Sequence, residues 1–294
     1  MNSPKNSVPV GILNINHFYH SCSLTHFKPK PILHDYIEHY WYLNWQLPLG
    51  KSHQQSVIPH PNTHLVFLAG KSHIQGICQQ KYTHTLTGRG DLIGVKFTPA
   101  GFYAFAQQAG LNMKEISNKV VEIDKVFDVD IKVSERQLQK LTTPLEKISY
   151  IDNILFFNKL SSLNTDNNIC KLNTIVAEIK VNKSLMKVSD VANTYAISER
   201  TLQRMFAKYI GVNIKWVINR YRIHDALTII DQSSNDASTR KLDWVSLAMQ
   251  LGYYDQAHFI HDFSELIGQS PKNYQQSLMI KNTLNFDPRR VENK

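Results

Sequence analysis

The stretch SERTLQRMFAKYIG, at residues 198–211, has a counterpart 57 residues further along the chain, DQAHFIHDFSELIG at residues 255–268. Each copy opens with a residue type that often caps a helix N-terminus and closes with a glycine, which is favoured just past a helix C-terminus. Apolar residues recur at positions i, i+4 and i+8 in both copies: Leu202, Phe206 and Ile210, and Phe259, Phe263 and Ile267. This spacing predicts two helices of one kind, each with a single buried face.

A shorter helical pattern precedes each copy. It covers VSDVANTY at residues 188–195 and WVSLAMQL at residues 244–251, where Ala192 and Ala248 are small enough to let two helices approach closely. A short helix, a tight turn and a second helix make a helix-turn-helix unit, and the sequence predicts this unit twice. The apolar spacing within residues 214–232 predicts one long helix that joins the two units.

The first long copy carries polar side chains away from its apolar face: Arg200, Gln203 and Arg204. Arginine can donate two hydrogen bonds to the O6 and N7 atoms of guanine, and glutamine can pair with the N6/N7 edge of adenine. An arginine on an exposed helix face is more often only solvated. The repeat, more than any single side chain, therefore favours base reading.

Residues of about 170–280 resemble the DNA-binding domain of the AraC/XylS family of bacterial transcription regulators. SERTLQRMF fits the pattern S-x-x-x-L-x-R-x-F, and LAMQLGYYDQAHFIHDF followed by GQSPKNY fits the second signature of the family. The resemblance implies that the second helix of each unit enters the major groove, with the two units roughly 34 Å apart. It also implies base-reading roles for the following residues: Arg200, Thr201, Gln203, Arg204, Asp255, Gln256, His258 and His261. For His258, support of the fold of the second unit is an equal alternative.

Three further cations are better candidates for phosphate contacts, which position a protein on DNA without specifying sequence: Lys208, Arg220 and Arg222. Two residues depart from the family pattern. Ala196 stands where the family often has glycine, and an alanine with positive φ costs roughly 1 kcal/mol. His261 stands where arginine is common, so we expect the first unit to dominate DNA affinity.

The first hundred residues read as β-rich. HLVFLAG (64–70), YTHTLTG (82–88) and DLIGVKF (91–97) are short runs of β-branched and aromatic residues that end in turn signals. Many short strands of this kind predict an antiparallel sandwich or a small barrel. From about Phe102 the pattern becomes helical, with further helices expected to start near Ser134 and Pro144.

This half also resembles, more loosely, the sensing half of one branch of the same family, through YIEHYWYLNW (36–45), VIPHPNTHLVFLAG (57–70) and TLTGRGDLIGVKFTPAGFYAF (85–105). In that family such halves are barrel-like, and they bind a small-molecule effector, form a homodimer, or do both. Four aromatic residues are candidates for an effector pocket: Tyr40, Trp41, Tyr42 and Trp45. The alternative, which a run of this kind favours, is that they pack a core.

The expected fold class is α+β, with an N-terminal β-rich barrel-like domain, a helical connector and a C-terminal all-α double helix-turn-helix. The expected domain ranges are 1–105 for the regulatory domain, 106–168 for the connector, 169–282 for the DNA-binding domain and 283–294 for a flexible tail. The polar, turn-rich stretch SSLNTDNN at 161–168 sets the main boundary.

Composition agrees with a nucleic-acid partner. The 294 residues carry a net charge of +9, which favours polyanions such as double-stranded DNA. No apolar run approaches the ~20 residues of a membrane helix, and the N-terminus lacks a signal pattern. We therefore expect a cytoplasmic protein without a membrane partner. The family resemblance adds RNA polymerase as a partner to consider.

Catalysis finds little support. The segment HFYHSCSLTH could suit zinc through His17, His20, Cys22 and His26, but no second paired motif accompanies it. Residues 1–100 contain only three acids, Asp35, Glu38 and Asp91, which argues against a metalloenzyme. We expect no enzymatic activity, no cofactor and no metal. Two alternative functions remain. One is a DNA-repair enzyme, which would need a reactive cysteine, but Cys22, Cys78 and Cys170 sit in no recognisable setting for one. The other is a non-specific DNA-compacting protein.

Overall fold

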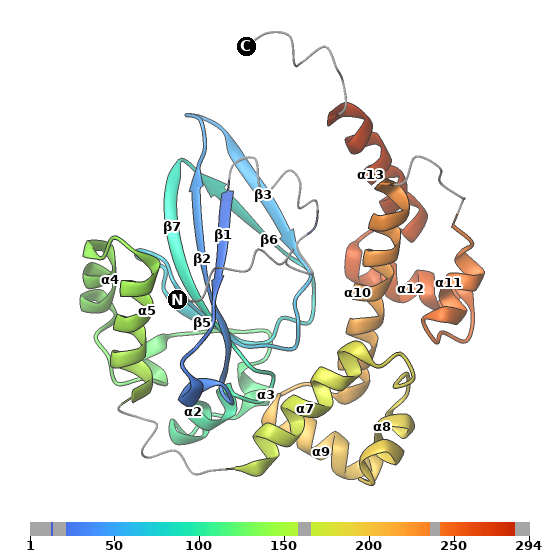
Figure 1. Cartoon of the computed structure of the whole chain (residues 1–294), viewed down its shortest axis with the longest axis horizontal. Coiled ribbons are helices and arrows are strands. Elements are labelled where there is room, and N and C mark those ends of the chain that lie inside the picture. The colour runs from blue at the N-terminus through green and yellow to red at the C-terminus, as the bar shows by residue number, and fades with distance from the viewer. Residues whose placement is uncertain (1–12, 14–21, 158–165, 236–241, 286–294) are drawn as a thin grey trace. The chain divides into compact units, whose positions relative to one another are not determined.

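The computed structural model describes residues 13, 22–157, 166–235 and 242–285 (Figure 1). The chain divides into two compact units, residues 1–217 and 218–294. This division falls inside the long helix predicted to link the two helix-turn-helix units, and the expected domain ranges stay a prediction. His17, His20 and most of the expected tail lie outside the described residues.

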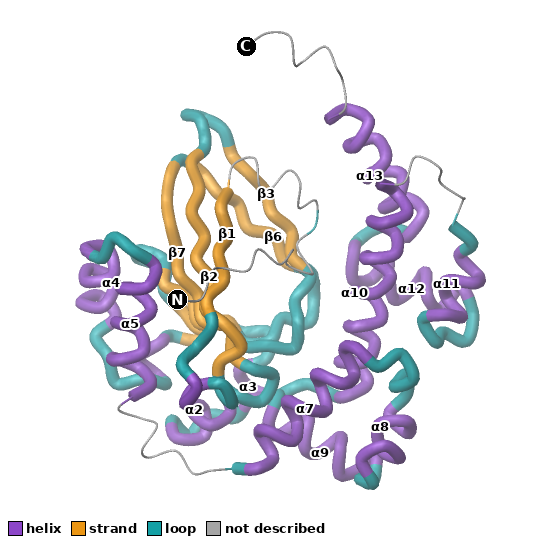
Figure 2. The backbone as a smooth tube through the Cα atoms, in the orientation of Figure 1, coloured by secondary structure: helices purple, strands orange, loops and turns teal. Residues whose placement is uncertain are grey.

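Antiparallel strands build the N-terminal part of the first unit (Figure 2). One sheet has the strand order β1 (Cys22–Phe27), β2 (Ile37–Gln46), β7 (Arg89–Phe97), β4 (His64–Phe67), β5 (His73–Gln75) and β8 (Val120–Val121). Strands β3 (Ser52–Val57) and β6 (Tyr82–Thr87) pair with each other. The prediction of a β-rich domain is confirmed. No ladder between described strands joins the two sheets, so they do not close into a barrel.

Strand β2 has two packing environments, because successive side chains point to opposite faces of a sheet. On one face, the fully buried Tyr40 donates a hydrogen bond to the carboxylate of Asp152. On the other face, an apolar cluster packs together: Leu24, Trp41, Leu43, Trp45 and Leu92. The aromatic run in this strand is therefore shared between two layers of the domain.

Short helices accompany the strands: η1 (Pro31–Leu33), α2 (Phe102–Gln108), α3 (Met113–Ile116), η2 (Ile123–Lys125), α4 (Ile131–Lys140), α5 (Pro144–Ile151) and the π-helical η3 (Asp152–Phe157). Pro144 opens α5 as predicted, after a capping box formed by Thr143 and Glu146. The predicted start of α4 at Ser134 is wrong. Asp130 caps that helix instead, because its carboxylate accepts a hydrogen bond from the Val133 amide.

An aromatic core connects the six-stranded sheet to these helices. The ring of Phe105 in α2 lies 5.8 Å from Phe97 of β7, 5.5 Å from Phe127 and 5.5 Å from Phe156 of η3, measured between centroids. All four rings are buried. Aromatic contacts of this geometry add to the free energy of apolar burial, and they hold α2 firmly against the sheet.

Three helices of the first unit come from the predicted DNA-binding region: α7 (Asn167–Val181), α8 (Val188–Tyr195) and α9 (Glu199–Tyr209). The side chain of Asn173 in α7 fixes them to the β-rich part. Its amide nitrogen donates to the Asp35 carbonyl at 2.9 Å and to the Thr98 hydroxyl at 3.0 Å. Its oxygen accepts from the Ala100 amide at 2.9 Å. The side-chain amide of Asn173 thus uses both of its N–H donors and one of its two oxygen lone pairs in the contact between α7 and the β-rich part.

Helix α10 (Ile214–Asn235) begins in the first unit and continues into the second, where α11 (Trp244–Gln250), α12 (Gln256–Ile267) and α13 (Pro271–Asn285) follow. The prediction of a single long helix over 214–232 is confirmed. In the second unit, the ring of Phe263 lies 5.8 Å from Phe259 and 5.9 Å from Tyr274. Of the helices in the described ranges, none has the length and apolar character needed to cross a membrane.

Candidate nucleic-acid interface

Helix α9 has one buried and one exposed face, as its sequence predicts. Ser198 caps the helix by accepting a hydrogen bond from the Thr201 amide at 3.2 Å, and its hydroxyl donates to the Thr201 hydroxyl at 2.9 Å. Leu202 and Phe206 are fully buried. Three side chains assigned to base reading are exposed on this helix: Arg200, Gln203 and Arg204. Thr201 is half-buried and already engaged by the cap.

The turn that leads into α9 passes through a left-handed residue. Ala196 has φ 50° and ψ 43°, so the alanine carries the conformational cost expected at this position, about 1 kcal/mol. The Ile197 amide donates to the Ala192 carbonyl at 3.0 Å and closes the turn. At the corresponding point the second unit has Gly252, with φ 75°.

The C-terminal end of α9 contacts α3. Gly211, just past the helix, has φ 88°, and its carbonyl accepts a hydrogen bond from the Ser117 hydroxyl at 3.0 Å. A Cβ atom on Gly211 would lie 2.5 Å from the carbonyl oxygen of Met113. Only glycine fits both the backbone conformation and the close approach. Helix α9 is thereby attached to the N-terminal part of its unit.

Lys208 lies at the same contact. Its ammonium nitrogen is 5.6 Å from the ring centroid of Tyr103 in α2 and 4.9 Å from that of Tyr209, within the range of cation–π attraction. A hydrogen bond with Tyr103 is the main cause of a raised pKa for Lys208. The side chain is exposed, and its phosphate contact stays a prediction.

Helix α12 repeats the pattern with different side chains. Asp255 caps it, since its carboxylate accepts a hydrogen bond from the His258 amide at 2.7 Å. Phe259 and Phe263 are fully buried. The side chains of His258 and His261 are 49% and 75% exposed. The histidines are therefore available to a partner, whereas the Asp255 carboxylate has a structural task.

Two other positions in this unit show mixed environments. Gln256 is half-buried and lines a small pocket with Leu242, Asp243, Trp244 and Val245 of the segment around α11. The ring of His258 meets the ring of Tyr253 edge-on, with centroids 5.2 Å apart. His258 thus contacts the fold of the second unit while half of its side chain remains exposed, which is compatible with both roles considered for it.

The two arginines of α10 are less exposed than a phosphate contact would favour, and that role stays a prediction. Arg220 is 4% exposed, and a buried guanidinium does not reach a DNA phosphate. Arg222 is half-buried, with its guanidinium carbon 5.2 Å from the ring centroid of Tyr253. Both observations favour a structural role for these side chains over the phosphate contacts expected from the sequence.

The four aromatic candidates for an effector pocket do not share one face of β2. Tyr40 lies on the face of Asp152, and Tyr42 faces Lys147 of α5, whose ammonium is 5.5 Å from the Tyr42 ring centroid. The two tryptophans lie on the opposite face, where β7 makes room for them with Gly94 and Gly90. A Cβ on either glycine would come within 2.1 or 2.5 Å of the Trp41 or Trp45 ring. The strand alternation therefore separates the four into two pairs.

Sequence reasoning missed a polar group on the tryptophan face. Register places His39 of β2 and His64 of β4 on either side of Lys96 of β7, whose ammonium pairs with the Glu38 carboxylate at 3.0 Å. Burial, followed by the charge of Lys96, lowers the pKa of both histidines to about 3. His26 joins them from β1, with its ring 4.7 Å from His39. These residues come from four strands, so only the pairing register reveals the group.

Comparison with protein families matches two parts of the chain. A helix-turn-helix domain family matches residues 191–277, which contain both candidate recognition helices. The chain carries an AraC-type helix-turn-helix domain. This confirms the resemblance found in the sequence. A second family, described as a domain of unknown function (DUF6597), matches residues 25–122 in the β-rich part.

Curated relatives match about a third of the chain. A transcriptional regulatory protein HptR of Staphylococcus aureus is 28% identical over 104 residues, which are 35% of this chain and 38% of the relative. An uncharacterized response regulatory protein of Staphylococcus epidermidis is 27% identical over a stretch of the same length. The chain thus spans only 38% of the length of these relatives.

Solved structures that match the chain include the C-terminal domain of AraT, a response regulator of Geobacillus stearothermophilus, and ToxT of Vibrio cholerae. The AraT domain is 22% identical, with 36% of this chain and 84% of that chain covered and a TM-score of 0.31. ToxT is 13% identical, with 87% of this chain and 98% of that chain covered and a TM-score of 0.34. The fold assignment therefore stands on the elements of this chain.

Proposed function

We propose that this protein is a transcription regulator that binds double-stranded DNA sequence-specifically by inserting α9 and α12 into successive segments of the major groove. The observation that carries the proposal is the exposed face of α9. Arg200, Gln203 and Arg204 are exposed there, while Leu202 and Phe206 on the other side are fully buried. These are the side chains that read guanine and adenine edges in the major groove.

The two recognition helices differ in charge, which supports unequal contributions. The reading face of α9 carries two guanidinium groups, which stay protonated at any working pH. Helix α12 offers histidines and also carries the carboxylates of Asp262 and Glu265. Since phosphate attraction supplies much of the affinity for DNA, the first unit is the stronger partner and the second mainly extends the sequence that is read.

Substitution of Arg204 tests base reading directly. Arg204→Ala is expected to weaken binding to a selected site by about 1–3 kcal/mol, or about 5- to 150-fold, with little effect on a scrambled duplex. Arg136→Ala is the matched control, because Arg136 is an exposed arginine of α4 outside the AraC-type domain. Fluorescence anisotropy at one fixed salt concentration measures both. Equal losses on the selected and scrambled duplexes would show that Arg204 contacts only phosphate.

We further propose that the N-terminal half controls DNA binding, through an effector or through homodimer formation. The contacts of Asn173 and Gly211 support this, because they attach the first helix-turn-helix unit to the β-rich part. Asn173→Ala removes three hydrogen bonds of that attachment. Coupling between two sites is typically about 1–3 kcal/mol, so DNA affinity of the variant is expected to change at least about 5-fold.

Asn153→Ala serves as the matched control, because Asn153 is an exposed asparagine of η3. Its DNA affinity is expected to equal that of the unmodified chain. An unchanged affinity in Asn173→Ala as well would mean that the attachment does not influence DNA binding, and control by the N-terminal half would have to work by another route.

A further inference from the structure

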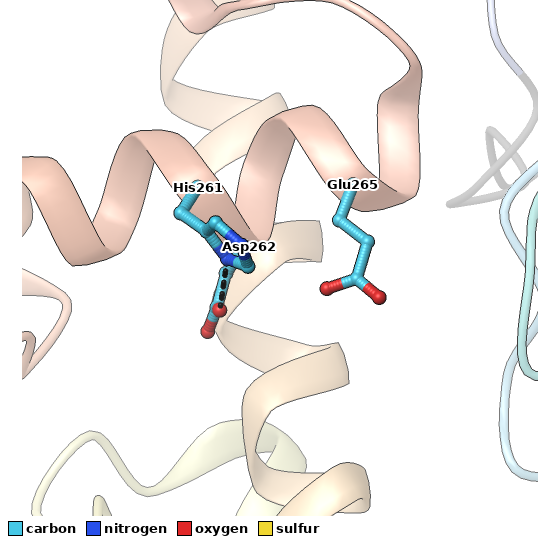
Figure 3. A group of neighbouring side chains, drawn as sticks. All are labelled: His261, Asp262 and Glu265. Atoms are coloured by element: carbon cyan, nitrogen blue, oxygen red, sulfur yellow. Dashed lines mark ion pairs between the residues drawn. The ribbon is translucent and has the colours of Figure 1, made fainter.

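Helix α12 carries a group of three potential metal ligands. Only one of them, His261, has a proposed role in base reading. His261, Asp262 and Glu265 each offer one ligand atom, and these atoms all lie within 4.8 Å of one another. Figure 3 shows the three side chains projecting to the same side of the helix. Helix geometry places Glu265 near the other two, because residues three or four positions apart lie next to each other on adjacent turns.

Asp262 is the fixed member of the group. Its side chain is 19% exposed, and its Oδ2 atom accepts a hydrogen bond from the amide of Asn219 in α10 at 3.4 Å. Around it, Nδ1 of His261 lies 3.6 Å from Oδ1, and Nε2 of His258 lies 3.6 Å from Oδ2. One half-buried carboxylate is thus flanked by two imidazoles at almost equal distances.

These distances suit a bound ion. Zinc binds imidazole nitrogen and carboxylate oxygen at about 2.0–2.2 Å with tetrahedral geometry, which sets neighbouring ligand atoms about 3.4 Å apart. The pairs of His258 and His261 with Asp262 already have nearly that separation. The ligand atom of the exposed Glu265 lies within 4.8 Å of those of His261 and Asp262, so its side chain would have to rotate to join the same ion. No change in the helix is needed.

The ligand chemistry favours transition ions over magnesium or calcium. Imidazole nitrogen suits zinc, nickel and copper, whereas magnesium and calcium prefer sites made of oxygen alone. The carboxylates of Asp262 and Glu265 supply two negative charges, which match a divalent cation. Binding at this position would engage the His261 imidazole, which is 75% exposed.

We propose that α12 binds one divalent transition ion of the zinc class through His261, Asp262 and Glu265, with His258 adjacent, and that this ion competes with DNA for His261. The competition rests on the proposed base-reading role of His261, whereas the metal site itself does not. By linkage, an ion that occupies His261 weakens DNA binding by the factor by which DNA weakens ion binding. The second recognition helix would then respond to the supply of the metal.

Isothermal titration of the full chain with zinc chloride tests the site without DNA. Glu265→Gln removes one ligand at constant size, and Glu115→Gln is the matched control on α3, since both glutamates are exposed. We expect the unmodified chain and the control to bind zinc equally, and Glu265→Gln and His261→Ala each to bind at least about 10-fold more weakly. Equal zinc affinity in Glu265→Gln and the unmodified chain would overturn the proposal.

Anisotropy with a selected duplex, with and without zinc, tests the competition. We expect zinc to weaken DNA binding of the unmodified chain and of Glu115→Gln, while Glu265→Gln binds DNA normally in metal-free buffer and responds little to zinc. The same zinc response in all three proteins would overturn the competition. Absence of specific DNA binding in metal-free buffer would instead refute the proposed function and leave the titration result intact.

Discussion

Replacement of Gly211 measures how firmly the first recognition helix is attached to α3. An alanine at φ 88° costs about 1–2 kcal/mol. Its Cβ would lie 2.5 Å from the Met113 carbonyl oxygen, and relieving such an overlap costs typically about 1–3 kcal/mol. The lower entropy of the unfolded chain returns about 0.4–1 kcal/mol. Gly211→Ala is therefore expected to lower the free energy of unfolding by about 1.5–4 kcal/mol.

Gly110→Ala isolates the conformational part of that cost. Gly110 has φ 71°, and a Cβ there would meet no atom within 4 Å. The expected loss is only about 0.5–1 kcal/mol, since the left-handed cost is partly offset by the unfolded-state entropy. The difference between the two variants reports the steric contact with α3 alone.

Urea unfolding followed by circular dichroism and tryptophan fluorescence measures both variants against the unmodified chain. A larger loss in Gly211→Ala, by about 1–3 kcal/mol, is the expected result. Equal losses in the two variants would refute the reasoning. They would mean that α9 does not pack on α3 in solution and that the AraC-type domain is not attached there to the N-terminal part.

Three further substitutions have expected outcomes. Ala196→Gly removes a strained left-handed alanine and is expected to stabilise the first unit by about 0.5–1 kcal/mol in urea unfolding, and a loss of stability would contradict this. Tyr40→Phe deprives the buried Asp152 carboxylate of a donor and is expected to cost about 1–3 kcal/mol, whereas Tyr254→Phe, at a residue 91% exposed, costs almost nothing. Burial raises the pKa of Asp231 to about 6, so its contribution to stability is fully present below about pH 4 and is lost as the pH rises through 6. Asp231→Asn is expected to flatten this dependence of the melting temperature on pH, and an identical profile in the variant would argue against it.

The helical half could be predicted from the sequence because its signals are local. Leu202 and Phe206 lie one turn apart, Ser198 caps the helix that contains them, and the apolar spacing after residue 214 continues through a single helix. The left-handed conformation of Ala196 was indicated only by the resemblance, because the family often has glycine at this position. The sequence is less decisive where two nearby residues could both cap a helix. At the start of α4 the cap is Asp130 rather than the predicted Ser134.

The candidate site in the β-rich half could not be predicted in the same way. Its composition indicates a run of aromatic residues, but only the alternation of β2 shows that Tyr40 and Trp41 face different layers. Likewise, His39, His64 and Lys96 are far apart in the chain and meet because three strands pair in one register. Strand register depends on contacts between distant segments, and a single sequence carries no direct signal for it.

Burial bears on the predicted role of the basic residues of α10. From the sequence, Arg220 and Arg222 look like the exposed cations that contact phosphate in many DNA-binding helices. Many side chains of α10 are buried, among them Val217, Ile223 and Ala226, and Arg220 is buried as well. A helix with apolar residues on most of its faces leaves few exposed positions, so charge alone is a poor guide to phosphate contacts there.

Selection of bound sequences from a random pool of DNA duplexes tests the central claim most directly. The full chain is used at near-physiological salt and free of added metal, because phosphate contacts make affinity steeply dependent on salt. Two short motifs about ten base pairs apart are expected, one for each recognition helix, and Arg204→Ala should lose the motif read by α9. Enrichment of no sequence, or of one motif that survives in Arg204→Ala, would contradict sequence reading by the two helix-turn-helix units.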